Sequence, residues 1–148
     1  MGFFDFLKSK TTDVWLDKNT GLMWQLDIPS NLMTWDEANQ YAHNINQKKY
    51  GGFTDWRLPT IEELERVYRY KNLDIAWKYK EKAINIVDFE YHFYWSSTLL
   101  GERLEKIHSF SNITEETLTN KAWNICIINA LAGYDIRTDH QCVRLVRG

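Results

Sequence analysis

Asp55, Trp56 and Arg57 are neighbours whose side chains are typical of an anion-binding or catalytic site. A planar guanidinium holds a carboxylate or phosphate through two parallel hydrogen bonds. An arginine within an aromatic loop more often satisfies backbone carbonyls or a nearby carboxylate, because buried polar groups need partners. We therefore expect Arg57 to have a structural role and to bind no substrate.

Ser96 and Ser97 are candidate nucleophiles in a run of strand-forming residues. A nucleophilic serine needs a positioned base and usually a sharp turn, as in the G-x-S-x-G motif. That motif is missing around them, and the four histidines of the chain show no recognisable triad pattern. We predict that these serines are strand-end hydroxyls, that the protein is not an enzyme, and that it needs no cofactor.

Cys126, His140 and Cys142 combine thiol and imidazole groups, which together suit zinc. The short C-x-x-C spacing of common zinc motifs is missing here. Unpaired cysteines commonly behave as small buried hydrophobic residues. A metal site therefore stays a minor hypothesis, and none is predicted.

Basic and aromatic side chains are interleaved over residues 66–82, a pattern that suits phosphates and stacked bases. The whole chain carries 18 Lys and Arg against 20 Asp and Glu, a net charge of −2. Such a balance supplies no general attraction for nucleic acid. We interpret this run as a solvated helical face and expect no nucleic-acid partner.

Two helices are predicted in the first half of the chain. Thr34 with Glu37, and Thr60 with Glu63, form capping-box patterns, in which each side chain satisfies the other's backbone N–H. Apolar residues follow each box at helical spacing, so we expect one helix to run to about Asn46 and a second to follow Thr60. A shorter third helix is predicted within residues 73–87.

Strands are predicted at both ends of this helical region. Residues 13–25 form two apolar runs around a turn cluster, which indicates a β-hairpin. Residues 92–98 and 122–128 are rich in aromatic and β-branched side chains, and the second run is apolar on both faces, as in a central strand. Residues 141–147 are interpreted as a closing strand with a wetter face at Arg144. Residues 99–121 and 130–141 are predicted to be polar excursions.

The chain length of 148 residues fits one core, formed by residues 11–148, with residues 1–10 as an apolar arm. Its aromatic content of 15% indicates a core built on large rings. We expect this structural core to include the following residues: Trp24, Trp35, Trp56, Arg57, Trp95 and Trp123.

No run of about 18 apolar residues is present, so no transmembrane segment is expected. Residues 1–10 lack the long apolar stretch and cleavage site of a secretory signal. We therefore expect a cytoplasmic protein, in which the two cysteines stay reduced.

Several collinear motifs together resemble one family, named for the C-terminal domain of the Legionella collagen-like adhesin. They are TGLMWQ at 20–25, WDEANQYA at 35–42, YGGFTDWRLPTIEEL at 50–64, YWSST at 94–98, AWNI at 122–125 and VRLVRG at 143–148. The resemblance implies an α+β, C-type-lectin-like fold, in which two main helices pack on twisted antiparallel sheets with long late loops. This fold is shared with formylglycine-generating enzymes.

Function is expected in the late loops, roughly residues 101–120 and 133–141, which look individual to this chain. We predict a non-enzymatic binding module, most simply a cytosolic partner of another protein, for example an immunity or antitoxin protein. Charged and aromatic side chains tend to dominate interfaces. The predicted partner-binding residues are Arg103, Glu105, His108, Tyr134, Arg137 and Asp139.

Two alternatives come from the resemblance. Adhesins of this family bind sulfated glycans, which implies glycan binding as the second hypothesis. Formylglycine-generating enzymes share the fold and hold copper with a close cysteine pair, which implies a metal oxidase as the third hypothesis. It ranks last because Cys126 and Cys142 are far apart in sequence and do not match that motif. The Glu-Pro-Asn and Gln-Pro-Asp calcium loops of C-type lectins do not occur, since Pro29 and Pro59 are the only prolines.

Overall fold

The computed structural model describes residues 14–69, 93–106 and 113–148. The predicted third helix at 73–87, most of the basic and aromatic run at 66–82, and the arm at 1–10 lie outside these residues. No helix in the described ranges has the length and apolar character needed to cross a bilayer.

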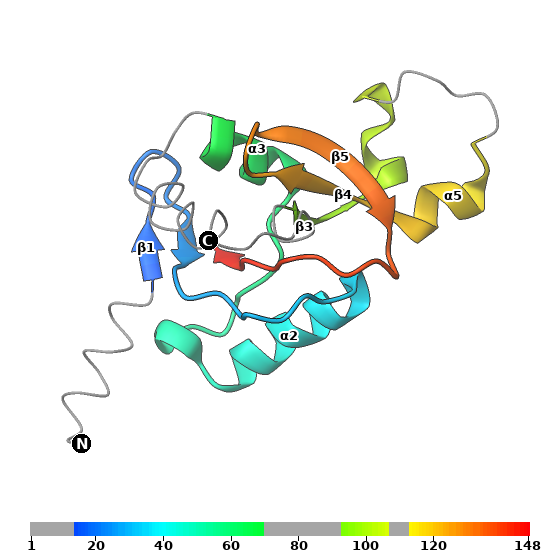
Figure 1. Cartoon of the computed structure of the whole chain (residues 1–148). Coiled ribbons are helices and arrows are strands. Elements are labelled where there is room, and N and C mark those ends of the chain that lie inside the picture. The colour runs from blue at the N-terminus through cyan, green and yellow to red at the C-terminus, as the bar shows by residue number, and fades with distance from the viewer. Residues whose placement is uncertain (1–13, 70–92, 107–112) are drawn as a thin grey trace, which may run out of the picture.

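Two three-stranded antiparallel sheets form the framework (Figure 1). The first has the order β1 (Val14–Leu16), β2 (Met23–Gln25) and β6 (Val146–Arg147). The second has the order β3 (Phe93–Leu99), β4 (Lys121–Cys126) and β5 (Leu131–Ile136). The predicted hairpin is therefore confirmed as β1 and β2, and β4 is the central strand of its sheet.

Both predicted helices are present, as α2 (Trp35–Gln47) and α3 (Ile61–Arg69). In each capping box the threonine hydroxyl accepts from the glutamate amide and the glutamate carboxylate accepts from the threonine amide. These reciprocal bonds satisfy backbone donors that a helix start leaves unpaired, so the starts of α2 and α3 are fixed locally. The 3₁₀ helix η1 (Tyr50–Gly52) follows α2.

The sheet of β3, β4 and β5 separates two apolar clusters. Tyr94, Trp123 and Ile125 pack on one side with α3, while Trp95 and Ala122 pack on the other with α2. Side chains alternate between the faces of a strand, so neighbouring residues of one strand enter different clusters. Trp24, Trp56, Trp95 and Trp123 are buried, and Trp35 is half-buried, with its Nε1 donating to the Ser96 carbonyl.

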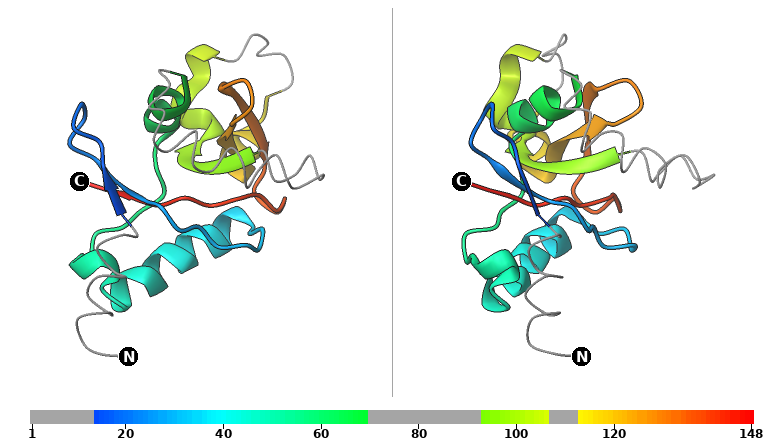
Figure 2. Two further views of the ribbon diagram at one scale, coloured as in Figure 1. Left: turned by 60° about the vertical axis from the view of Figure 1, so that its left-hand side comes forward. Right: turned by 90° about the vertical axis from the view of Figure 1, so that its left-hand side faces the viewer.

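Residues 141–147 run between α2 and the β3–β4–β5 sheet, as both views of Figure 2 show. The amide of Cys142 donates to Phe93, and the amide of Gln25 donates to Leu145. The segment is therefore covered on all sides, and the predicted wetter face at Arg144 is wrong. Arg144 is 0% exposed, its Nη1 donates to the Gln25 carbonyl over 2.9 Å, and only Val146–Arg147 is a regular strand.

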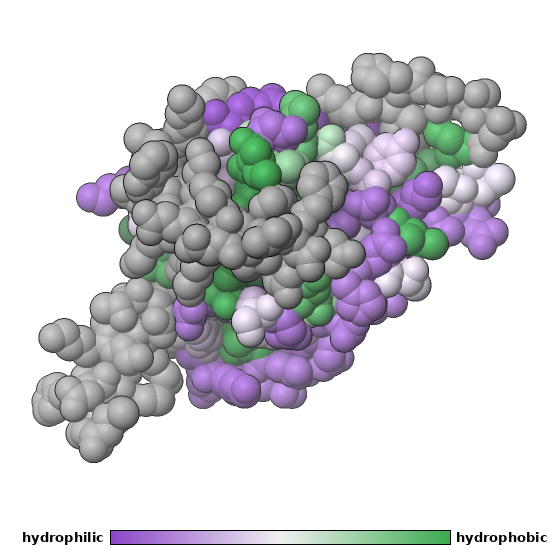
Figure 3. Space-filling view, viewed as in Figure 1, coloured by the Kyte–Doolittle hydropathy of each residue, from purple (hydrophilic) through white to green (hydrophobic). Residues whose placement is uncertain are grey.

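The two predicted excursions contain regular structure. Residues 99–121 include the 3₁₀ helix η3 (Leu100–Lys106) and the helix α5 (Glu115–Asn120), and residues 131–136 form β5. The prediction of residues 130–141 as a polar loop is therefore wrong for its first half, because these residues pair along β4. Hydrophilic residues cover the surface over α2, at the bottom of Figure 3.

Candidate functional site

A groove of about 680 Å³ lies along β5 and the segment that follows it. Its lining comes from all three strands of one sheet and from the chain that leads into the C-terminal segment, so it depends on the complete second half of the fold. Its lining residues are Phe93, Asn124, Gly133, Tyr134, Asp135, Thr138, Asp139, His140 and Gln141.

Asp135 is held in the groove by two amide groups. Its Oδ2 accepts hydrogen bonds from Asn124 Nδ2 over 2.6 Å and from Gln141 Nε2 over 2.8 Å. Asn124 is on the central strand β4, and Gln141 is fixed by paired backbone bonds with Met33. The carboxylate is thus positioned by neutral donors, and within the described ranges no cation forms an ion pair with it.

The same two amides each leave an oxygen without a partner. Asn124 Oδ1 and Gln141 Oε1 make no hydrogen bond in the part of the chain that the structure describes, although these residues are only 1% and 5% exposed. A buried acceptor left unpaired costs about 1–3 kcal/mol. Two such acceptors beside one carboxylate make this region rich in unused hydrogen-bonding capacity.

Gly133 keeps the backbone of β5 close to Asn124. A Cβ atom at position 133 would lie 3.2 Å from Asn124 Oδ1, which is tighter than ordinary contact. Asn124 is buried and bonded to Asp135, so it has little freedom to move away. Glycine at this position therefore lets the backbone of β5 lie close against the buried oxygen of Asn124.

The rim of the groove carries exposed residues from the segment after β5. Thr138, Asp139 and His140 are all exposed, and His140 Nε2 lies 3.8 Å from Glu37 Oε1. Tyr134 is 41% exposed and contacts Trp123 edge-on at 5.3 Å between ring centres. The rim thus offers a carboxylate, an imidazole and a hydroxyl to a partner, while the Tyr134 ring lies on the other face of the sheet against Trp123.

The structure places the predicted partner-binding residues in different environments. Tyr134 and Asp139 line the groove. Arg137 lies outside the lining, where it stacks 4.4 Å from the centre of the Trp35 ring and pairs with Asp36 over 2.5 Å. His108 and the side chain of Glu105 are outside the described residues.

Arg103 is not a surface anchor. It is 6% exposed, its Nη1 pairs with Glu65 on α3, and its Cζ lies 5.4 Å from the centre of the Trp123 ring. The guanidinium therefore ties η3 to α3 and β4 and has little surface left for a partner, so its partner-binding role stays a prediction.

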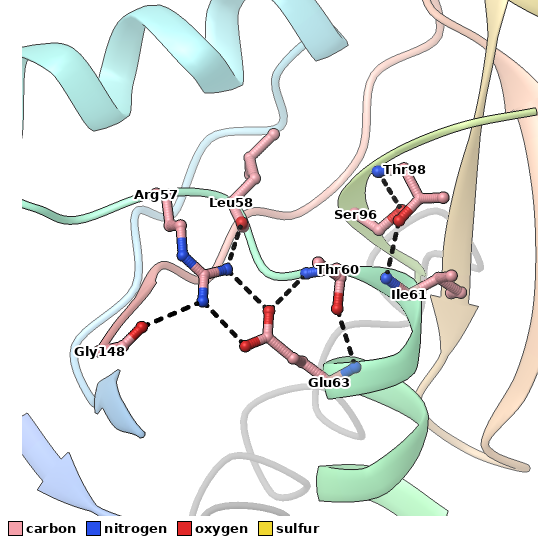
Figure 4. A network of polar contacts seen from close by, with 8 residues as sticks. All are labelled: Arg57, Leu58, Thr60, Ile61, Glu63, Ser96, Thr98 and Gly148. Carbon is pink, nitrogen blue, oxygen red and sulfur yellow. Dashed lines mark hydrogen bonds and ion pairs between the residues drawn. The ribbon is translucent and has the colours of Figure 1, made fainter. Parts of the chain in front are cut away.

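Arg57 has structural contacts, although its side chain is 41% exposed and so lies at the edge of the core (Figure 4). Its Nη1 and Nη2 donate to the two oxygens of Glu63 over 2.7 and 2.9 Å. Burial opposes ionisation of Glu63, but Arg57 and the Thr60 amide outweigh it, and the pKa of this carboxyl falls below its ordinary value. Asp55 pairs with Arg147, whose hydrogen bond lowers the pKa of Asp55.

Ser96 is used by the fold. Its hydroxyl is buried, donates to the Trp123 carbonyl over 2.7 Å and accepts from the Thr98 amide. Figure 4 shows the neighbouring Thr98 hydroxyl accepting from the first amide of α3, that of Ile61. These hydroxyls join β3 to α3 and β4.

The two cysteines lie on opposite sides of Phe93. Phe93 on β3 is paired with Cys126 on β4, and its carbonyl accepts from the Cys142 amide on the other side. Two strand spacings separate the cysteine backbones by roughly 10 Å, beyond the reach of a disulfide. His140 points toward Glu37, and the described residues contain no group of three or more metal-binding side chains. Burial raises the pKa of the Cys142 thiol to about 12.

The sequence analysis did not single out Asn124, Asp135 or Gln141. One signal was available, since Asn124 interrupts the otherwise apolar run from Ala122 to Ile128. A polar residue on a covered strand needs a partner, which here is Asp135.

Two helices packed on antiparallel sheets, with the late part of the chain folded over them, define a C-type-lectin-like α+β domain. The model of the Lcl C-terminal domain matches residues 13–147, and the chain belongs to this family. No curated protein matches the chain.

Solved structures similar to the chain have low identity to it. One is the complex of a mutant von Willebrand factor A1 domain with botrocetin, at 10% identity and a TM-score of 0.48, covering 90% of this chain and 94% of that chain. A second is TC14, a C-type lectin from the tunicate Polyandrocarpa misakiensis, at 9% and 0.47, covering 84% and 98%. A third is the snake venom toxin convulxin, at 11% and 0.45, covering 91% and 92%.

Proposed function

We propose that this protein is a non-enzymatic binding module that receives another protein in the groove along β5. The observation that carries the proposal is the positioned carboxylate of Asp135, with unpaired acceptors on Asn124 and Gln141 beside it. Such a site has hydrogen-bonding capacity that its own fold does not use.

The surroundings of the groove suit a protein partner. Leu131, Tyr134 and Ile136 of β5 are exposed apolar residues, and Ile128 in the preceding turn is also exposed. Apolar and aromatic surface around a polar centre is typical of protein interfaces. Within the described residues β5 pairs only with β4, so its outer edge offers backbone groups to a partner as well. We place this interaction in the cytoplasm, as an immunity or adaptor protein would require.

The proposal is tested with a variant that blocks the groove. Thr138 is exposed at its rim, so Thr138→Trp fills the entrance without entering the core. Lys18→Trp, in the exposed turn between β1 and β2, is the matched control. A partner captured by the tagged wild type and by Lys18→Trp, and lost with Thr138→Trp, supports the proposal once the purified proteins reproduce the binding. Equal binding by both variants contradicts it.

A glycan is the second candidate ligand, favoured by membership of the Lcl C-terminal domain family. Carboxylate, amide and hydroxyl side chains in the groove also suit sugar hydroxyls. A glycan array probed with the same three proteins decides between the candidates. Glycan binding that Thr138→Trp abolishes would replace the protein partner by a sugar.

A further inference from the structure

We propose that the groove takes the guanidinium group of an arginine side chain from the partner, with Asp135 as its anchor. This inference rests on the proposed function and names the chemistry of its ligand. The starting observation is that the groove's described side chains present acceptors in excess of donors around Asp135.

The charge of the groove favours a cation. Asp135 and Asp139 contribute carboxylates to the lining, and among the described residues no Lys or Arg lines it. Two described cations next to the lining have contacts of their own. Arg137 is held by Asp36 and the Thr119 carbonyl, and the Lys121 ammonium lies 5.6 Å from the centre of the Tyr134 ring, on the face of the sheet opposite Asp135.

The arrangement of acceptors favours N–H donors. Asp135 lies between Asn124 and Gln141, each of which has one unpaired buried oxygen. Asp135 is the partly exposed member of this amide–carboxylate–amide set, and the two buried amides fix its carboxylate for an incoming donor group. A guanidinium has five N–H donors in a plane and no acceptor, so it matches such a set better than a single ammonium.

Two further features point the same way. Phe93, on the same face of the sheet as Asp135, adds an aromatic residue to the lining, and a guanidinium stacks favourably on aromatic faces. An inorganic cation would need more charged ligands, whereas the described residues hold no group of three or more His, Cys, Asp or Glu side chains that suits a metal.

The test uses purified full-length protein and three capped amino acids: N-acetyl-arginine methylamide and its lysine and citrulline counterparts. Backbone amide shifts in NMR spectra report the binding site and the affinity. The arginine compound is expected to shift amides of residues 124 and 133–141. The neutral citrulline compound should bind roughly tenfold more weakly or not at all, since it keeps the shape and loses the charge.

Two variants connect binding to the anchor. Asp135→Asn keeps the shape of the side chain and should weaken the arginine compound by roughly tenfold. Asp139→Asn, at an exposed position, should weaken it by a smaller factor and cannot disturb the core. Glu116→Gln, on the exposed side of α5, is the matched control and should bind as the wild type does. Thermal unfolding checks that each variant is folded.

Several results would overturn the inference. Equal affinity for the citrulline compound, full affinity in both aspartate variants, or shifts confined to residues outside the groove each contradict it. Equal affinity for the lysine compound would replace a guanidinium by a general cation. Tighter binding of free L-arginine would assign the groove to a free amino acid. Binding of the arginine compound without any groove-dependent partner would refute the proposed function alone.

Discussion

Asn124 on the central strand β4 donates a hydrogen bond of 2.6 Å to Asp135 on the edge strand β5. The donor is 1% exposed, and its own carbonyl oxygen has no partner in the described part of the chain. A buried amide thus fixes a charged group at the wall of a groove. Such an arrangement is hard to explain by stability alone, because the unpaired oxygen costs free energy.

Asn124→Asp is expected to destabilise the protein in a pH-dependent way. Two adjacent carboxylates repel each other, so the folded pKa of the pair rises above the ordinary value of about 3.9. The folded state then binds more protons than the unfolded state, and stability falls as the pH rises above about 4. We expect a loss of roughly 1–3 kcal/mol at pH 7 that shrinks towards pH 4, measured by urea unfolding.

The matched control for this change is Asn129→Asp, in the exposed turn between β4 and β5, where the side chain accepts from the Leu131 amide. An aspartate can make the same bond, so its stability should follow the wild type. A loss at Asn124→Asp that is independent of pH would mean that the new carboxylate does not sense Asp135.

Glu63→Gln is expected to remove an acid-sensitive part of the stability. The lowered pKa of Glu63 means that its contribution is present above the ordinary value and is lost as the pH falls through the folded pKa. Solvent screens the pair because Arg57 is 41% exposed, so we expect a loss of about 1 kcal/mol at pH 7 and a smaller one below about pH 4. Unfolding curves across this range, with Glu116→Gln as control, would contradict the account if the loss grew on acidification.

Arg103→Ala is expected to destabilise the fold by about 1–3 kcal/mol, because it removes a buried guanidinium that pairs with Glu65, whose side chain is only 13% exposed. Arg69 pairs with the same carboxylate from an exposed position on α3. Arg69→Ala should therefore cost only about 0.5 kcal/mol. Equal effects of the two changes in denaturant unfolding would refute the buried role of Arg103.

Cys142 is expected to resist alkylation in the folded protein. With a pKa of about 12, only about one thiol in ten thousand is ionised at pH 8, and the side chain is buried. Treatment with iodoacetamide followed by peptide mass spectrometry should label Cys142 only when urea is added. Labelling in native buffer at the rate seen in urea would contradict its burial.

The elements fixed by local chemistry could be predicted from the sequence. Thr34 with Glu37 and Thr60 with Glu63 lie within one helical turn, so their capping boxes can be recognised without tertiary contacts. The hairpin of β1 and β2 has Gly21 in its turn at a φ of 75°, a conformation that glycine favours and that sequence patterns indicate well.

Strand β5 was missed because its turn lacks this signal. Ala130 occupies the left-handed region at a φ of 57°, where glycine or asparagine is expected. Its amide donates to the Cys126 carbonyl, which closes the turn between β4 and β5. The pairing along β4 thus outweighs an unfavourable turn residue, and no local pattern reveals that.

The buried arginines were misjudged for a related reason. Arg103 and Arg144 are charged residues in polar or alternating runs, which indicates exposure. Their burial depends on partners far away in sequence, Glu65 for one and the Gln25 carbonyl for the other. The groove depends on the same kind of distant contact, since Asn124, Asp135 and Gln141 meet only after the sheet forms.

Photocrosslinking from the groove tests the central claim most directly. A benzoylphenylalanine in place of Tyr134, which is exposed and lines the groove, is compared in living cells with one in place of Leu16, which is exposed on the other sheet. We predict a discrete protein adduct from position 134 and none of the same mass from position 16. The same adducts from both positions, or adducts from position 16 alone, would contradict a partner-binding groove along β5.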